Sequence, residues 1–478
     1  MAIAGGSGLV ISVMVARSLG ASAMGAYSLL AWIAGTIAAL SSAGLPDAIS
    51  KFVAHHKGAG DVARAGQFAR LIFRAQVMAA GIVFLFGAAV WCALDREHIG
   101  LVLAASASVM PSALQQTLLA LLEGEQRFDL QAAATLVGSI LQVLVVALVA
   151  WLHPTVMGFL VGAFVSAGLV VAVTFALSRP FLRASSPGSN EMRLTGVARE
   201  IVAFSLPVYA LWILNLIVFD KSEFLFLSHY GAAEQVAFYG IGFALTARLA
   251  TAGDSIVYVL FPMFVVSLAR EGAGELRDRY RQSIRYLQMP MFPLCCWAIP
   301  MLPALIVLAY GKQFAGVAPV VQVLMVTLLF SVSMSVSSSA MYALDRQFSI
   351  LRWMIPVAVL NIALDFLLIP RWGAVGAAIA NGVSQAVAAC GLIVLMRRAL
   401  PGAFPLRDSL KIALAAVVSA APIFCAERYI GGVLALSAAA AVAILLYILL
   451  LKGLRTLTTE ESSMLERRLM LLLNRTGG

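Results

Sequence analysis

The sequence predicts an all-α polytopic membrane protein with about 14 transmembrane helices, arranged as two six-helix lobes followed by two C-terminal helices. Composition is the first reason: 62% of the 478 residues are hydrophobic and only 12% are charged, with a mean hydropathy of +0.95. Spacing is the second. The apolar residues form stretches of about 17 to 25 residues, the length that a helix needs to cross a hydrocarbon core about 30 Å thick.

The apolar stretches fill the chain and leave no gap large enough for a soluble domain. The first one lacks the basic region and the cleavage site of a signal peptide, and its short cytoplasmic end leads us to expect a natural start upstream of Met1. The predicted spans are 2–19, 25–44, 71–93, 99–122, 132–152, 157–178, 201–228, 236–261, 286–309, 319–343, 351–369, 374–396, 411–427 and 432–451.

Positive charges are distributed asymmetrically between the connections. With the N-terminus inside, 25 of the 33 Lys and Arg residues lie in cytoplasmic connections, five lie outside and three lie within spans. This distribution satisfies the positive-inside rule and predicts that both termini are cytoplasmic. The net charge of +10 therefore reflects topology, and no binding of nucleic acid is expected.

The two halves of the chain resemble each other weakly. Because each half would contain an even number of helices, the repeats would be parallel, with a cavity between them. The echoing segments are 20–27 with 231–239, and 123–128 with 343–348. The predicted domains are an N-lobe at 1–200, a C-lobe at 201–400, and at 401–478 the last two helices with an amphipathic cytoplasmic tail.

Motifs of enzymes are missing from the sequence. Gly311-Lys312 lacks the glycine spacing of a phosphate loop, and the five histidines form no zinc pair at helical spacing. The five cysteines lie in apolar spans without metal-ligand spacing and are interpreted as small core residues. We therefore expect no enzymatic activity, no metal and no cofactor, apart from a coupling proton or sodium ion.

Ionisable residues inside the predicted spans are the strongest functional signal. A charge at the bilayer centre costs at least about 2.5 kcal/mol, so it usually faces a polar interior. Span seven contains Asp220, Lys221 and Glu223, and span eight contains Arg248 and Asp254. At about 1.5 Å per residue, Asp220 and Arg248 lie at similar depths. These charges would line a cargo cavity, or alternatively form an ion pair that only holds two helices together.

Three of the candidate positions carry competing interpretations. Asp254 is near the cytoplasmic end of its span, where it could simply face water. Arg17 ends the first span at the outer surface, so a topological role competes with cargo binding. Asp365 lies one turn after Asn361 on the same helical face and is expected to be buried enough to need a partner, which makes it the second candidate for an ion-coupling carboxylate.

Several short stretches, in their order and spacing along the whole chain, resemble the Wzx-type flippases. These form the polysaccharide transporter family of the multidrug/oligosaccharidyl-lipid/polysaccharide exporter superfamily. The matching stretches are Ala16-Arg17-Ser18-Leu19-Gly20, Gly25-Ala26-Tyr27, Gly44-Leu45-Pro46-Asp47-Ala48-Ile49, Phe219-Asp220-Lys221, Ala309-Tyr310-Gly311-Lys312-Gln313-Phe314 and the segment Leu368 to Ala380.

The resemblance implies fourteen helices, two lobes and a cationic central cavity. It also implies a cargo of polyprenyl-pyrophosphate-linked oligosaccharide, moved by alternating access to the outer leaflet of a bacterial inner membrane for surface polysaccharide biosynthesis. The candidates for the pyrophosphate are then Lys221, Arg248 and, third, Arg17. Those for sugar hydroxyls or a coupling cation are Asp220, Glu223 and Asp365, although the family pattern has an uncharged Asn at the last position.

The expected partners are the lipid-linked oligosaccharide, membrane lipids and polysaccharide polymerase machinery, with the chain acting as a monomeric, ion-coupled antiporter. Within transporters, the alternative is a lipid II flippase or a multidrug exporter of the same superfamily. From another class, the alternative is a membrane polysaccharide polymerase or ligase. Such enzymes generally need a sizeable outer loop with catalytic groups, and every predicted outer connection is short.

Overall fold

The computed structural model describes residues 2–42, 44–94, 99–183, 199–202, 205, 209, 222–430 and 432–456. The regular elements of these ranges are all helical, which confirms the predicted fold class. Ten helical stretches among them are long and apolar enough to cross a membrane. The elements are α1 (Ala2–Ser42), α2 (Leu45–Gly58), α3 (Val62–Leu94), α4 (Ile99–Ala107), α5 (Val109–Gly124), α6 (Phe128–Leu152), α7 (Val156–Arg183), α9 (Ser222–Tyr230), α10 (Ala233–Glu271), α11 (Ala273–Tyr310), the short 3-10 helix η2 (Lys312–Phe314), α12 (Val317–Ala343), α13 (Gln347–Ala399), α14 (Leu406–Ser419), α15 (Ala421–Tyr429) and α16 (Val433–Gly453).

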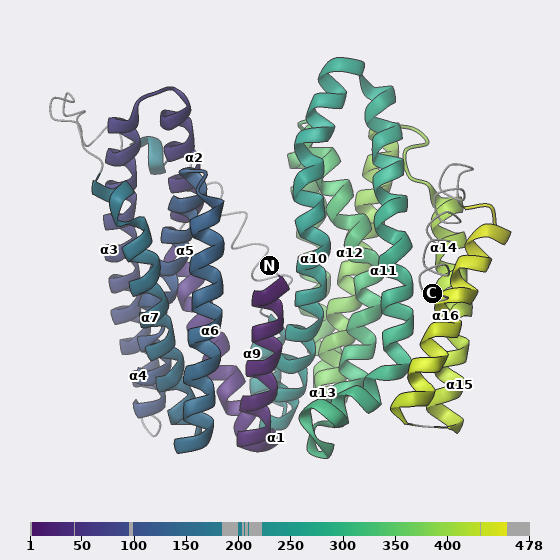
Figure 1. The fold of residues 1–478 in the computed structure, drawn as a ribbon, viewed down its shortest axis with the longest axis horizontal. Helices are drawn as coiled ribbons and strands as arrows, with labels where there is room; N and C mark the ends of the chain where they lie inside the picture. Colours follow the sequence, from purple (N-terminus) through teal and green to yellow (C-terminus); the bar gives the residue numbers. More distant parts are fainter. Residues whose placement is uncertain are drawn as a thin grey trace, which may run out of the picture. The chain divides into compact units, whose positions relative to one another are not determined.

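Two of the longest helices each contain two predicted spans. Helix α1 is interrupted at Gly20 (φ 78°, ψ 172°) and α13 at Gly373 (φ 52°, ψ −130°). Both backbone conformations have positive φ, which glycine adopts without a steric penalty. At Gly20 the chain reverses direction, so the second half of α1 runs opposite to the first half (Figure 1). Most of predicted span seven lies outside the described residues.

Two predicted connections are helical instead. Helix α2 occupies most of the segment between the second and third predicted spans. The basic segment 262–285 was predicted as a link, but α10 and α11 continue through it and only Gly272 (φ 82°) separates them. An i,i+4 ion pair between Glu275 and Arg279 at 2.6 Å stabilises this polar helical extension. Most of link 179–200 and the predicted tail helix after residue 456 lie outside the described residues.

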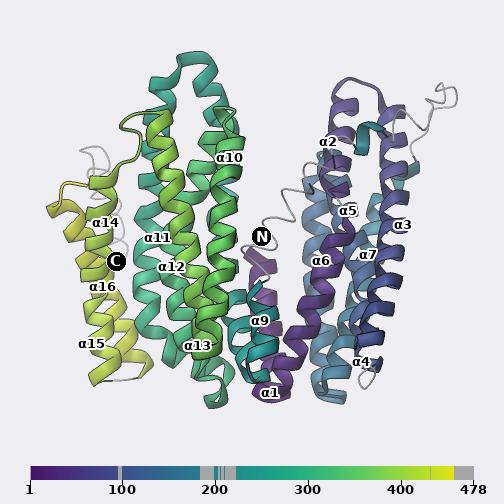
Figure 2. The same ribbon diagram turned by 180° about the vertical axis from the view of Figure 1, so that it is seen from behind.

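Packing divides the chain into two compact units. The first comprises 1–241 with 369–374, and within it α2 packs on α3 and α5 while α6 packs on α1 and α7. The second comprises 242–368 with 375–478, and within it α11 packs on α12 and α14 while α16 packs on α14 and α15 (Figure 2). The predicted domain boundaries at 200 and 400 remain a prediction.

The weak sequence repeat coincides with a repeated helix ending. Gln126 after α5 (φ 58°) and Asp345 after α12 (φ 56°) both adopt the left-handed conformation. In each case the N–H of the next residue donates to a carbonyl five residues earlier, at 2.9 Å, as in a Schellman motif. Helices α2 and α16 end in the same way, at Gly60 and Arg455.

Candidate functional site

Two of the predicted charged residues, Asp220 and Lys221, lie outside the described residues. Asp254 belongs to α10, but its side chain also lies outside the described part of the chain. The predicted proximity of Asp220 to Arg248 therefore remains a prediction.

The two remaining carboxylates are both fully buried. Glu223, in the first turn of α9, and Asp365, in the first half of α13, have 0% exposed surface. Asn361 and Asn381, on the same helix as Asp365, are equally buried. An ionised carboxylate in such a place is stable only with a compensating partner, so these positions suit groups that bind a proton or a cation.

The two predicted cationic residues differ in their surroundings. Arg248, in α10, is half-buried, and among the described residues its buried Nη1 atom has no hydrogen-bond partner. A buried donor without a partner costs about 1–3 kcal/mol, and more when it is charged, which favours an anionic ligand at this nitrogen. Arg17, in the first half of α1, is exposed, which fits either of its two predicted roles.

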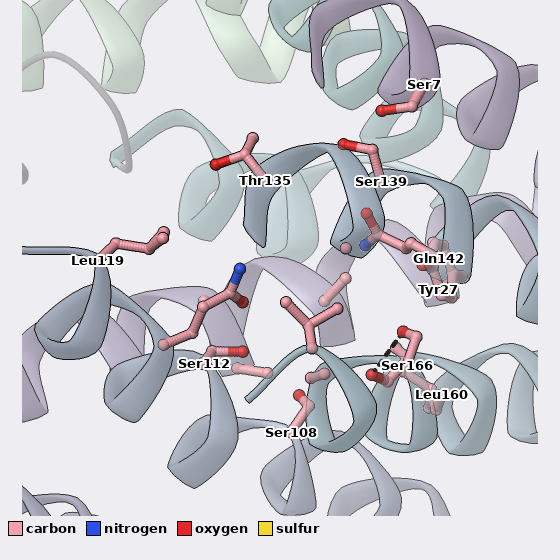
Figure 3. Close-up of a pocket in the computed structure, with 18 residues that line it drawn as sticks. Ser7, Tyr27, Ser108, Ser112, Leu119, Thr135, Ser139, Gln142, Leu160 and Ser166 are labelled. Atoms are coloured by element: carbon pink, nitrogen blue, oxygen red, sulfur yellow. Dashed lines mark hydrogen bonds between the residues drawn. The ribbon is translucent and has the colours of Figure 1, made fainter. Parts of the chain in front are cut away.

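The first unit also contains a cavity of about 380 Å³ between α1, α5, α6 and α7 (Figure 3). Eighteen residues line it; nine carry hydroxyl or amide side chains and none of the eighteen is charged. The nine polar residues are Ser7, Tyr27, Ser108, Ser112, Gln115, Thr135, Ser139, Gln142 and Ser166.

Five of the nine polar side chains around the cavity keep hydrogen-bonding capacity for a ligand. Ser108, Thr135 and Ser166 donate their hydroxyl protons to carbonyls of the preceding helical turn, at 2.8, 2.8 and 3.0 Å, so their oxygens can accept. Within the described part of the chain, the amides of Gln115 and Gln142 make no hydrogen bond. The cavity therefore presents both acceptors and donors.

Local backbone features create this space. The reversal of α1 at Gly20 allows Ser7, from its first half, and Tyr27, from its second half, to line the same cavity. A Cβ atom at Gly138 would lie 2.9 Å from Val170, so glycine lets α6 approach α7 closely. By contrast, a Cβ atom at Gly35 would meet nothing within 4 Å, although Gly35 also lines the cavity.

Charged residues in the sequence could not reveal this cavity, because none of the residues that line it is charged. The signal was available in the spacing of uncharged polar residues. Ser108, Ser112 and Gln115 recur at i, i+4 and i+7 within an apolar stretch, and Thr135, Ser139 and Gln142 repeat that spacing in the next one. Such spacing places three polar side chains on one helical face.

This helical architecture has clear counterparts among solved structures, and they are transporters. The chain is similar to the lipid II flippase MurJ in an inward closed conformation, with a TM-score of 0.69, 15% identity and 98% of each chain covered. It is similar to an inward-facing multidrug resistance MATE family transporter of the MOP superfamily (TM-score 0.65, 15% identity, 83% of this chain and 94% of that one). A MOP superfamily transporter from Pyrococcus furiosus gives a TM-score of 0.53, with 14% identity over 84% of this chain and 96% of that one. The chain thus has the MOP transporter fold.

The family follows from the sequence match. Residues 14–319 match the family described as polysaccharide biosynthesis protein, and the chain belongs to this family. A search of curated proteins found no match. Together with the apolar helices, these findings define a membrane protein of this family with the fold of MOP transporters, and they confirm the predicted family relationship.

Proposed function

We propose that this protein is a flippase that moves polyprenyl-pyrophosphate-linked oligosaccharide from the inner to the outer leaflet of a bacterial inner membrane, for surface polysaccharide biosynthesis. The observation that carries the proposal is the family match over 14–319, in a chain that folds along its whole length like a flippase of a lipid-linked precursor. Both termini are cytoplasmic in this proposal, and polysaccharide polymerase machinery receives the product.

The polar groups of this chain match what such a cargo needs in order to cross a membrane. A glycan cannot cross hydrocarbon without hydrogen-bond partners, because unsatisfied polar groups cost several kcal/mol there, on the order of 4–8 kcal/mol each in a purely apolar solvent. The hydroxyls and amides around the first unit's cavity offer such partners. The pyrophosphate needs cations, for which Arg248, Lys221 and Arg17 are the candidates, while the prenyl chain can stay in lipid.

Ion coupling is the second part of the proposal. A proton or sodium ion would drive transport only if its affinity differs between inward-open and outward-open states. Glu223 and Asp365 are fully buried, so a change of surroundings would alter their affinity for a cation strongly. Neutralising the coupling group, by Glu223→Gln, Asp365→Asn or Asp220→Asn, should abolish the response of flipping to an imposed ion gradient and leave slow downhill exchange.

The decisive experiment is flipping in proteoliposomes of defined composition. A polyprenyl-pyrophosphate oligosaccharide should be translocated, whereas lipid II and a cationic drug, offered in parallel, should not. Preferential transport of lipid II or of the drug would replace the proposal with the corresponding alternative, and formation of a longer glycan would indicate a polymerase.

A charge variant connects the assay to the structure. Arg248→Ala should reduce flipping at least about tenfold, and Arg248→Lys should retain part of the activity because an ammonium keeps the charge but not the bidentate geometry of guanidinium. Arg277→Ala removes an arginine of the polar extension of α11 whose side chain is 44% exposed, and it is the matched control. A collapse of membrane abundance for Arg248→Ala would instead identify Arg248 as a structural clamp.

A further inference from the structure

We propose that the cavity between α1, α5, α6 and α7 is a binding site for one uncharged sugar residue of the transported glycan. This inference rests on the proposed function and deepens it, because it separates the recognition of the sugar from that of the pyrophosphate. The site lies entirely within the first unit.

The size of the cavity suits a single small polar ligand. Its volume of about 380 Å³ is far larger than the roughly 30 Å³ that one water molecule occupies. It falls at the lower end of the range of about 300–1,000 Å³ that is typical of small-molecule sites. A single monosaccharide unit is therefore a better match than a whole oligosaccharide.

The hydrogen-bonding groups match those of a sugar. A sugar hydroxyl both donates and accepts, so its site needs acceptors and donors together. The oxygens of Ser108, Thr135 and Ser166 accept, because their own protons are used within their helices. The amides of Gln115 and Gln142 supply donors, and among the described residues neither has another hydrogen-bond partner.

An aromatic ring complements these polar groups. Tyr27 lines the cavity, and its ring packs edge-on against Phe159, with the centroids 6.2 Å apart. A ring held in this way offers apolar area to the C–H face of a pyranose at little cost in side-chain freedom. Tyr27 and Gln142 both line the cavity, so an apolar ring and a polar amide are available to the same ligand.

Charge limits the choice of ligand. None of the eighteen residues described around the cavity is charged, so a buried ion would find no opposite charge there. Burying an unpaired carboxylate or ammonium is far more costly than burying a hydroxyl that is hydrogen-bonded. The cavity should accordingly discriminate against uronic acids, amino sugars and phosphate in favour of neutral sugars.

Two glycines provide a matched pair of variants. Gly35→Leu would project a side chain from α1 toward open space at the cavity wall, since a Cβ atom there meets nothing within 4 Å. Gly81→Leu makes the same change in α3, where a Cβ atom also meets nothing within 4 Å and the residue does not line the cavity. Gln142→Leu is an independent variant. It removes the amide that would bond to the sugar and keeps a side chain of similar size, so the cavity is not filled.

Sugar binding can be measured directly by saturation-transfer difference NMR on the purified protein in nanodiscs, which avoids competition from sugar-based detergents. The probes are the methyl glycosides of glucose, galactose and mannose, with methyl glucuronide as the anionic counterpart. We expect saturation of at least one neutral glycoside and at least about tenfold weaker binding of the glucuronide, equivalent to about 1.4 kcal/mol. Gly35→Leu should abolish binding, Gln142→Leu should weaken it severalfold, and Gly81→Leu should leave it unchanged.

Three results would overturn the site: no saturation of any neutral glycoside, equal binding of the glucuronide, or unchanged binding in both Gly35→Leu and Gln142→Leu. The flipping assay separates this inference from the proposed function. If Gly35→Leu loses sugar binding but flips the lipid-linked glycan at the parental rate, the cavity is not a cargo site and the flippase proposal stands. If the parent protein binds the glycoside but flips no lipid-linked glycan, the sugar site stands and the flippase proposal fails.

Discussion

The cavity of the first unit and the α11–α12 contact of the second unit use polar side chains in different ways. In the first unit, the amides of Gln115 and Gln142 face a cavity without protein partners among the described residues. In the second unit, polar side chains of α11 pair with serines of α12: the Tyr280 hydroxyl lies 2.8 Å from the Ser337 hydroxyl, and Gln288 donates to Ser333 at 3.0 Å. Paired groups stabilise a fold, whereas unpaired groups beside a cavity are available to a ligand.

Helices α11 and α12 are also more deeply buried than the other candidate membrane spans of the described chain. In the second unit, 56% of the residues in the most apolar stretch of α12 are buried, and 44% in α11. The corresponding share for α6 in the first unit is 22%. The last helices add to this core, because Trp297 donates to Ser419 at 2.9 Å and Tyr447 donates to the carbonyl of Met289 at 2.7 Å. The comparison indicates that α11 and α12 form a structural core and that the first unit retains space for binding.

The largest expected effect is on stability, when the same substitution, glycine to leucine, is made in each of the two units. In α13, Gly391 contacts the indole of Trp353 so closely that any side chain would overlap it. Gly391→Leu should therefore destabilise the second unit by about 3 kcal/mol or more, since overpacking of a dense core costs about 1–3 kcal/mol even where neighbours can adjust. Gly35→Leu, at the cavity wall where a Cβ atom meets nothing within 4 Å, should leave stability within about 0.5 kcal/mol of the parent.

The measurement is thermal unfolding in detergent. Unfolding is monitored through the labelling of the Cys295 thiol, which is buried in the folded protein. Equal losses for Gly391→Leu and Gly35→Leu would show that the cavity is not open space and would remove the contrast between the two units.

The next effect tests the paired polar groups. Tyr280→Phe leaves the Ser337 hydroxyl buried without its partner and should cost about 1–3 kcal/mol. In a double-mutant cycle, Ser337→Ala should cost little more once Tyr280 has been replaced. Ser139→Ala, at the cavity of the first unit, is the matched hydroxyl deletion and should change stability by less than about 0.5 kcal/mol. A loss as large as that for Tyr280→Phe would mean that Ser139 is structural.

The fold could be predicted from hydropathy because a membrane span leaves a signal in every residue of a long apolar stretch. Details that depend on single residues could not be predicted so well. The breaks at Gly20 and Gly373 look like ordinary helix boundaries in the sequence. Polar segments such as α2 and the extension around Gly272 resemble links in the sequence, although tertiary packing and ion pairs make them helical.

The site was predicted only in part. Burial of Asp365 beside Asn361 followed from their position within an apolar span, and the structure agrees. The neutral cavity was missed because serine and glutamine in apolar spans are common, and only the packing of four helices shows that two polar stripes face the same space. Sequence patterns report helical faces, but not which faces meet.

A smaller effect is expected at the surface of the first unit. Lys57, at the end of α2, lies 2.6 Å from the carboxylate of Glu125 after α5 and also donates to its carbonyl at 2.9 Å. Partly exposed ion pairs contribute about 0.2–1 kcal/mol. Lys57→Met should thus lower stability by less than Tyr280→Phe does, and the difference from the parent should shrink in 0.5 M salt because screening weakens the pair. A loss that is insensitive to salt would assign the effect to the carbonyl contact.

The smallest effect is a pH dependence of the first unit. His56 in α2 stacks on Phe68 with ring centroids 4.8 Å apart, and burial lowers the pKa of His56 below its ordinary value of 6.5. The neighbouring side chains of His55 and Arg64 lower the pKa of His56 further, whereas Asp61 and Glu200 oppose the shift. Because the unfolded chain then binds a proton more readily than the folded one, stability is retained above pH 6.5 and decreases as the pH falls through that value toward the lower pKa of the folded state.

We expect His56→Gln to reduce the drop in unfolding temperature between pH 7.5 and pH 5.5. Ser337→Ala, in the core of the second unit, should lower the unfolding temperature by the same amount at both pH values, because no titrating group of α2 lies in that core. If His56→Gln leaves the pH dependence of the parent unchanged, protonation of other groups governs acid sensitivity and α2 makes no contribution to it. If it removes part of the dependence, protonation of His56 contributes to the acid sensitivity of the first unit, because the unfolded chain binds that proton more readily than the folded one.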